Sequence, residues 1–213
     1  MNRQTKRILM SLFGVIICGI SVGIFKLAAM GVDPFQSLMS GLDQLIPFSF
    51  GLLYVIVNLV LLSFSLLADR HYIGLATFIN LFLFGYITQF CYSFLQKLFP
   101  APSVLFRGIC LIIAIVIICF ASALYMTADL GVSTYDAVAL ICANKWNLGP
   151  FKYVRITTDL ICVVAGICVY LLGGGKASDI PTFVGIGTII TAFFMGPLID
   201  FFNRTVAIPF LEK

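Results

Sequence analysis

Six stretches of this chain are each long and apolar enough to cross a lipid bilayer. A helix rises about 1.5 Å per residue, so about 20 apolar residues span a hydrocarbon core of about 30 Å. The six stretches are approximately Ile8–Ala29, Gly51–Ala68, Ile73–Leu95, Val104–Met126, Phe151–Leu172 and Thr182–Phe202. Because they leave no segment for a separate soluble domain, we predict an all-α polytopic membrane protein.

The composition agrees with this fold class. Of the 213 residues, 61% are hydrophobic and 10% are charged, whereas roughly a quarter of the residues in an average soluble domain are charged. The net charge of +4 is not concentrated in a patch, so nucleic acid is not expected as a partner. The seven cysteines lie in apolar runs without C-x-x-C spacing. This pattern is typical of buried apolar residues, and we expect no cofactor and no metal.

Two shorter segments, Pro34–Ile46 and Thr134–Lys145, follow the first and fourth long runs. Each begins with signals for a helix start. "DPFQ" has an acceptor at the N-cap, proline at N1 and Gln at N3, and "STYD" has a hydroxyl at the N-cap and an acid at N3. Both patterns predict capping boxes. Each joint is therefore predicted to be a helix end followed at once by a capped helix start.

The order of long and short segments occurs twice. "IGLATFINLFLFGYITQFC" (Ile73–Cys91) aligns with "VGIGTIITAFFMGPLIDFF" (Val184–Phe202). The identical pairs are Gly74/Gly185, Thr77/Thr188, Phe82/Phe193, Gly85/Gly196 and Phe90/Phe201. We predict two tandem structural repeats, residues 1–101 and 102–213, each with a long helix, a short capped helix and two long helices.

The short helices leave the number of crossings open. A helix over Pro34–Ile46 is about 20 Å long, and the few residues up to Gly51 reach only roughly 13 Å. A re-entrant loop descending that far could not return in so few residues, so each short helix either lies flat at the interface or crosses. Six crossings make the repeats inverted, and eight make them parallel. In both cases the Lys and Arg distribution predicts cytoplasmic termini.

The aligned halves differ in one respect. Three times the first half has an amide where the second has a carboxylate: Gln36 and Asp136, Asn58 and Asp159, Gln89 and Asp200. Ionisable groups at membrane depth usually line a cavity or pair with a partner. The predicted substrate-binding residues are Gln36, Asn58, Gln89, Asp136, Arg155, Asp159 and Asp200.

Each carboxylate also has a purely structural explanation. Asp136 is correctly placed to do no more than cap its helix. Asp159 lies four residues after Arg155, so the two can neutralise each other along one helix face. Asp200 lies four residues before Arg204 near a helix end, where it can simply be hydrated. These alternatives stay open at the level of the sequence.

Several motifs extend over nearly the whole chain. They are "GVDPFQ", "GVSTYD", Gly51 to Asn58, Arg155 to Asp159, and "GIGT" followed by "MGPLID" up to Asp200. In these motifs the chain resembles the YczE/YitT-like family of bacterial membrane proteins. It departs from the family pattern at Gln36, where Asp is usual, and at Asp159, where Glu is usual. The resemblance implies a duplicated fold in the bacterial cytoplasmic (inner) membrane and supplies no substrate.

Duplicated halves with interrupted helices and polar groups between them are the common plan of secondary transporters. We therefore predict a small-solute transporter with a polar site between the repeats, in which proton coupling through the carboxylates of the second half is left open. The alternative is a structural or regulatory subunit of a larger membrane complex. An enzyme is not expected, because the only histidine lies in a charged turn. The expected partners are the lipid bilayer and a small polar solute, and a homodimer is left open.

Overall fold

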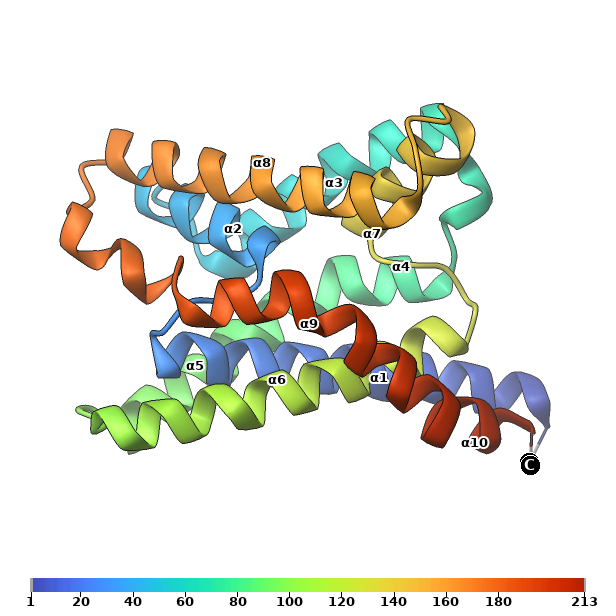
Figure 1. Cartoon of the computed structure of the whole chain (residues 1–213), viewed down its shortest axis with the longest axis horizontal. Helices are drawn as coiled ribbons and strands as arrows, with labels where there is room; N and C mark the ends of the chain where they lie inside the picture. The colour runs from blue at the N-terminus through green and yellow to red at the C-terminus, as the bar shows by residue number, and fades with distance from the viewer. Residues whose placement is uncertain (1, 213) are drawn as a thin grey trace.

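The computed structural model describes residues 2–212. For residues 151, 152 and 196 it describes the backbone only. This part of the chain is all α-helical, as predicted (Figure 1). Its ten α-helices are α1 (Arg3–Ala28), α2 (Pro34–Leu45), α3 (Phe50–Ala68), α4 (Leu75–Ile79), α5 (Gly85–Leu98), α6 (Val104–Thr127), α7 (Thr134–Leu140), α8 (Phe151–Leu172), α9 (Ile186–Phe202) and α10 (Ile208–Glu212).

The number of candidate membrane spans is five, or six if a bent pair is counted as one. The five are Arg3–Ala28, Phe50–Ala68, Leu75–Leu98, Val104–Thr127 and Tyr153–Leu172. The bent pair is Ile186–Met195 with Pro197–Glu212, at an angle of 51°. Helices α2 and α7 are not among the spans, so by length and composition the structure favours six crossings over eight.

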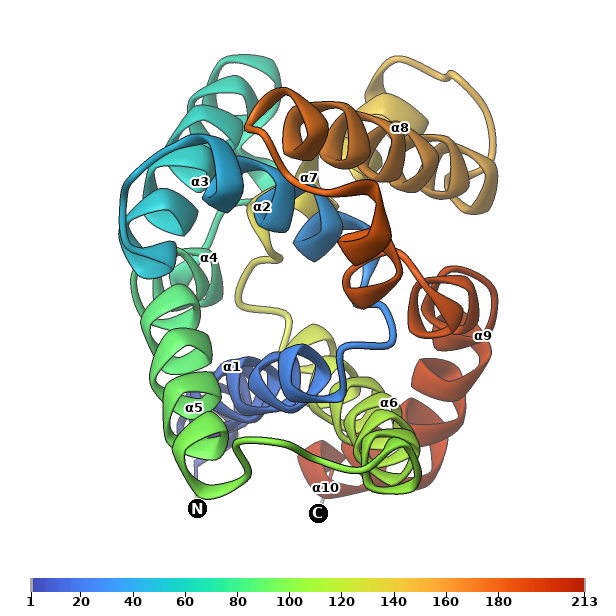
Figure 2. The ribbon, with the colours of Figure 1, turned by 90° about the vertical axis from the view of Figure 1, so that its left-hand side faces the viewer.

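The long helices lie roughly along one direction and form two groups (Figure 1). Helix α1 packs against α5 and α6, and α6 also contacts α9. The other group holds α2, α3, α7 and α8, in which α2 packs against α8 and α7 against α3. Figure 2, which looks along the helices, shows the connections that lead into α2 and α7 passing between the two groups.

The two joints have the same backbone conformation. Ala29 and Asp129, just after the long helices, have φ values of 46° and 51°, and Gly31 and Gly131 have φ values of 100° and 102°. A positive φ near 100° is accessible to glycine and strained for residues with a Cβ. In addition, a Cβ on either glycine would overlap backbone atoms of Gly185 or Gly74. The joints are therefore sharp turns packed directly against other backbone.

Helix α2 returns to the end of the molecule that α1 reaches. The extended residues after α1 lead inward, α2 then runs back outward, and the α2–α3 connection lies at the same end as the end of α1 (Figure 1). Helix α7 does the same from the opposite end. The connection between α1 and α2 therefore leads toward the middle of the molecule, and α2 leads back toward the end from which the connection came.

Glycines allow α2 to lie close to α8. A Cβ on Gly41 would overlap the carbonyl group of Gly166, and a Cβ on Gly166 would approach the Ser37 carbonyl oxygen at 2.6 Å. Small residues at such crossings let two helix backbones approach within a membrane. These contacts place α2 along the second half of α8, and its last residue, Leu45, lies against Gly173 just after that helix.

Two arginines tie the long helices α1 and α6 together at opposite ends. Arg7 on α1 donates from Nε to the Ala128 carbonyl oxygen at 2.6 Å, beyond the end of α6. Arg107 on α6 donates from Nε to the Ala28 carbonyl oxygen, also at 2.6 Å, at the end of α1. The last carbonyls of a helix lack partners within it, and a cation near them is favourable. Each arginine therefore caps the end of the other long helix.

Candidate functional site: a buried charged cluster between the joints

The starts of α2 and α7 meet inside the molecule. The rings of Phe35 and Tyr135, each the second residue of its helix, stack with centroids 4.9 Å apart and planes 19° apart. Both rings are buried. Because each helix carries a partial positive charge at its N-terminus, two such ends are brought together in the interior.

The N-caps form as predicted, but the capping boxes are incomplete. Asp33 Oδ1 accepts from the Gln36 backbone N–H at 3.2 Å, and Ser133 Oγ accepts from the Asp136 N–H at 3.1 Å. The side chains at N3 do not reach back to the cap backbone. Gln36 Oε1 is buried and has no hydrogen-bond partner among the side chains and backbone that the structure describes, and Asp136 bonds to other groups. The prediction was half right: both caps form, and neither reciprocal bond from N3 does. At Asp136, tertiary partners replace the local bond.

Asp136 is the most heavily bonded carboxylate of the site. Its Oδ2 accepts from the Tyr125 hydroxyl at 2.9 Å and from the Ser133 hydroxyl at 2.6 Å, and its Oδ1 pairs with Arg155. These donors come from α6, the joint and α8. With its side chain only 9% exposed, Asp136 does more than cap a helix.

Arg155 lies between two carboxylates. Besides Asp136, it pairs through Nε with Asp159 Oδ1 at 3.2 Å, and its guanidinium lies 4.4 Å from the centroid of the Tyr135 ring. The Tyr135 hydroxyl in turn donates to Asp159 Oδ1 at 2.6 Å. We refer to Asp136, Arg155 and Asp159 as the central cluster. It places two acids against one base.

The first half contributes neutral polar groups beside the central cluster. Asn58 on α3 is buried; its Nδ2 donates to the Tyr54 carbonyl oxygen at 2.7 Å, and its Oδ1 accepts from the Thr134 hydroxyl of α7. The side chain of Tyr54 makes a further bond, because its hydroxyl donates to Asn80 Oδ1 at 2.9 Å. Asp33 is near enough for its carboxylate to interact electrostatically with Arg155 and Asp159. Both halves of the chain thus reach one polar region.

Two predicted site residues lie elsewhere. Gln89 Oε1 accepts from the Gly51 N–H at 3.1 Å and so caps the start of α3. Asp200 pairs with Arg204 at 3.0 Å, with side chains 58% and 76% exposed. Of the predicted site residues, the structure brings together Asn58, Asp136, Arg155 and Asp159, and Gln36 follows Phe35 at the start of α2. Gln89 and Asp200 lie apart from this region, because Gln89 bonds to the start of α3 and Asp200 pairs with Arg204.

Sequence reasoning missed two partners of the central cluster, Tyr125 and the hydroxyl of Tyr135. It also missed Thr134, which donates to Asn58 beside the cluster. Tyr135 lies within the "STYD" motif, but its spacing to Asp159 does not predict a hydrogen bond between them. Among the residues that the structure describes, no group of three or more His, Cys, Asp or Glu side chains could hold a metal ion. The seven cysteines are all free thiols.

The helices and the buried charges define a polytopic integral membrane protein. Within that class, the chain belongs to a family of unknown function, DUF6198, whose model matches residues 5–204. It is 28% identical to an uncharacterized protein of Haemophilus influenzae over 96% of this chain and 86% of that protein.

Two Bacillus subtilis proteins are also similar. The uncharacterized protein YyaS is 24% identical over 94% of both chains. The uncharacterized membrane protein YczE is 24% identical over 88% of this chain and 81% of that protein. The match to YczE confirms the resemblance predicted from the joint motifs. No solved structure matches this chain.

Proposed function

We propose that this protein transports a small polar solute and that the central cluster forms part of the solute site. The observation that carries the proposal is the pairing of the half-buried Arg155 with two buried carboxylates, Asp136 and Asp159, where α2 and α7 begin. Charged groups inside a membrane protein are costly and mark solute or ion pathways. In secondary transporters, the N-terminal ends of interrupted helices commonly face the solute.

We infer that residues 1–101 and 102–213 are tandem repeats, inverted relative to each other. Matching hydrogen bonds support this inference. The Val32 N–H donates to the Phe183 carbonyl oxygen and the Val132 N–H to that of Tyr72, both at 3.1 Å. The Gly187 N–H donates to Met30 and the Ala76 N–H to Leu130, at 2.8 and 2.9 Å. Each joint thus packs against the start of the last helix of the other repeat.

An inverted pair of repeats explains how the two short helices enter from opposite ends. With three crossings in each repeat, the chain begins and ends on the same side. The basic residues Arg3, Lys6 and Arg7 near the N-terminus place that side in the cytoplasm under the positive-inside rule. The proposed location is the bacterial cytoplasmic membrane with both termini inside.

Two features of the site bear on the class of solute. Gln36 Oε1 is a buried acceptor without a partner, and such a group costs free energy unless a donor reaches it. The central cluster has more negative than positive groups, so a proton or a solute that carries donors would balance it. Proton coupling through Asp136 or Asp159 belongs to the proposal for this reason.

A structural or regulatory membrane subunit is the second candidate. The observation that favours it is that Asp136, Arg155 and Asp159 are all bonded to one another or to neighbouring hydroxyls. A closed polar network of this kind can fix the packing of helices without binding anything.

Thermal unfolding of the purified protein with a panel of solutes separates the two candidates. The panel contains amino acids, sugars, polyamines, quaternary amines and organic acids. A transporter is stabilised by its solute through mass action, and we expect at least one class to raise Tm. The effect should vanish in Gln36→Leu and persist in Asp200→Asn. If no class raises Tm, or if Gln36→Leu responds like the wild type, the proposed site is wrong.

A further inference from the structure

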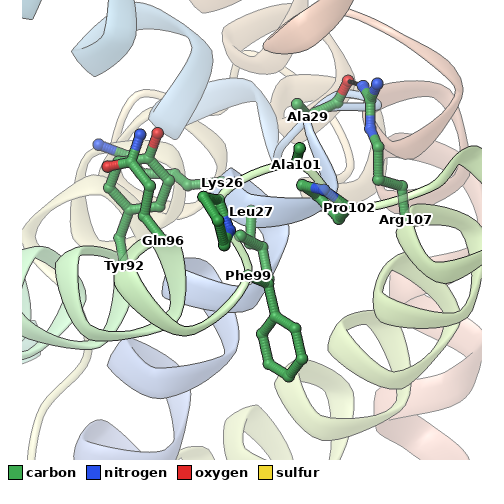
Figure 3. Close-up of a pocket in the computed structure, with 10 residues that line it drawn as sticks. Lys26, Leu27, Ala29, Tyr92, Gln96, Phe99, Ala101, Pro102 and Arg107 are labelled. Atoms are coloured by element: carbon green, nitrogen blue, oxygen red, sulfur yellow. Dashed lines mark hydrogen bonds between the residues drawn. The ribbon is translucent and has the colours of Figure 1, made fainter.

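A second polar site lies at the end of the molecule where α1 ends and α5 connects to α6. It is a pocket of about 330 Å³, at the lower end of the usual range for small-molecule sites. Figure 3 shows Lys26, Tyr92 and Gln96 grouped on one side of this pocket and Arg107 on the other, beside Ala29. The rest of the lining is apolar and comes from Leu27 on α1 and from Phe99, Pro100, Ala101 and Pro102 of the α5–α6 connection.

The polar side chains of this pocket can all donate hydrogen bonds, and two of them are cationic. None of its described lining residues is acidic. Arg107 uses Nε and Nη2 on the carbonyl oxygens of Ala28 and Ala29. Because a guanidinium carries five N–H groups, it retains free donors. A pocket lined in this way is suited to an anion.

Lys26 gives a second, independent indication of a missing partner. Its Nζ lies 3.1 Å from the centroid of the buried Phe50 ring, a cation–π contact. Among the residues that the structure describes, no hydrogen bond or ion pair joins this ammonium group to an acceptor. Asp43 interacts with it electrostatically without forming an ion pair. A partly buried ammonium without an acceptor is costly, and a bound anion would offset that cost.

We propose that this pocket binds a phosphate group, held by Lys26 and Arg107 with Tyr92 and Gln96 as further donors. Guanidinium and ammonium groups bind phosphate oxygens through charge-assisted hydrogen bonds. The pocket lies at a helix end, where lysine and arginine side chains reach the headgroup region. The same chemistry suits a lipid phosphodiester and a free phosphate ion. This site is separate from the central cluster and does not rest on the proposed transport.

The test measures thermal unfolding of the purified protein in an uncharged detergent at constant ionic strength. One arm adds short-chain phosphatidylglycerol, and the other adds inorganic phosphate. We expect stabilisation that saturates, with a half-saturating concentration about tenfold higher in Lys26→Met, since a charge-assisted bond is lost. Lys26→Arg keeps the cation and should retain binding. Lys97→Met removes a charge from α5 outside the pocket and should bind like the wild type.

The two arms identify the source of the phosphate. Stabilisation by phosphatidylglycerol alone assigns the pocket to a lipid headgroup, and stabilisation by inorganic phosphate assigns it to a free phosphate-bearing solute. If neither probe stabilises the wild type, or if Lys26→Met and the wild type respond at equal concentrations, the proposed phosphate site does not exist. A folded Lys26→Arg variant that loses binding together with Lys26→Met would also contradict it.

Discussion

The starts of α2 and α7 have nearly the same backbone and quite different side-chain chemistry. Both follow a left-handed residue and a glycine with φ near 100°, and both have a capped N-terminus. At the third position of α7, Asp136 has three partners, whereas Gln36 at the third position of α2 has an acceptor with none. The same backbone conformation thus carries a charged third residue in α7 and a neutral third residue in α2.

This difference indicates which features serve the fold and which serve a site. The sharp turns, caps and close backbone contacts occur at both joints, as expected for structural requirements. An acid at the third helix position occurs at the second joint only, because the first joint has its carboxylate at the N-cap, Asp33. The fold itself therefore does not demand an acid at the third position. Four sets of substitutions test this division, and they follow in order of decreasing expected effect on stability.

Arg155→Met should have the largest effect. It leaves Asp136 and Asp159 buried without their cation, and removing one partner of a buried ion pair costs about 3–5 kcal/mol. Arg204→Met is the control, because it breaks the exposed i,i+4 pair with Asp200, where about 0–1 kcal/mol is expected. The free energy of unfolding in mixed micelles measures both. Equal losses of unfolding free energy in the two variants would show that the central cluster contributes no more to stability than an exposed ion pair.

Gly31→Ala and Gly131→Ala should destabilise the protein to a similar extent, because both joints have the same strain and overlap. Each forces a Cβ against backbone at a positive φ, for which about 1–3 kcal/mol is typical. Gly108→Ala is the control, since nothing lies within 4 Å of the position that its Cβ would occupy; it should leave Tm unchanged or raise it. A large difference in the loss of stability between Gly31→Ala and Gly131→Ala would contradict the structural equivalence of the two joints.

Tyr135→Phe makes the ring at the second joint the same as Phe35 at the first. It removes the hydroxyl that donates to Asp159 and keeps the stacked ring. A hydrogen bond to a charged group contributes about 1.5–3 kcal/mol, and Arg155 still pairs with Asp159, so we expect a loss of about 1.5 kcal/mol. Tyr153→Phe, at an exposed tyrosine, should cost almost nothing by the same measurement.

Gln36→Leu should have the smallest effect on stability and can even be favourable. It removes a buried acceptor that has no partner, and such an atom carries an uncompensated desolvation cost of about 1–3 kcal/mol. Asn58→Leu is the contrasting variant, because Asn58 is buried and bonded to both α7 and its own helix. A clear fall in Tm for Gln36→Leu would mean that its side chain does have a structural partner.

The sequence predicted the helices well because their signals are local. The apolar runs, Pro34 at N1 and the caps at Asp33 and Ser133 each act over a few residues, and the observed bounds follow them closely. The pairing of Arg155 with Asp159 is also local, since i,i+4 residues share a helix face.

The rest depends on contacts between distant segments, which no local pattern specifies. The capping of α6 by Arg7, of α1 by Arg107 and of α3 by Gln89 joins residues far apart in the chain. The direction of α2 is set by its packing against α8 and by the joint's bonds to residues 182 and 183. Gln89 was predicted at the site because its alignment with Asp200 was visible and its partner Gly51 was not.

The central claim is that the buried charges of the second half serve a solute pathway. Once a stabilising solute is found, exchange of that radiolabelled solute by proteoliposomes tests the claim most directly, with Asp159→Asn compared with Asp200→Asn. We predict that Asp159→Asn, although folded, loses exchange, whereas the exposed Asp200→Asn exchanges at the wild-type rate. Wild-type exchange by Asp159→Asn would contradict the claim and remove this carboxylate from the pathway.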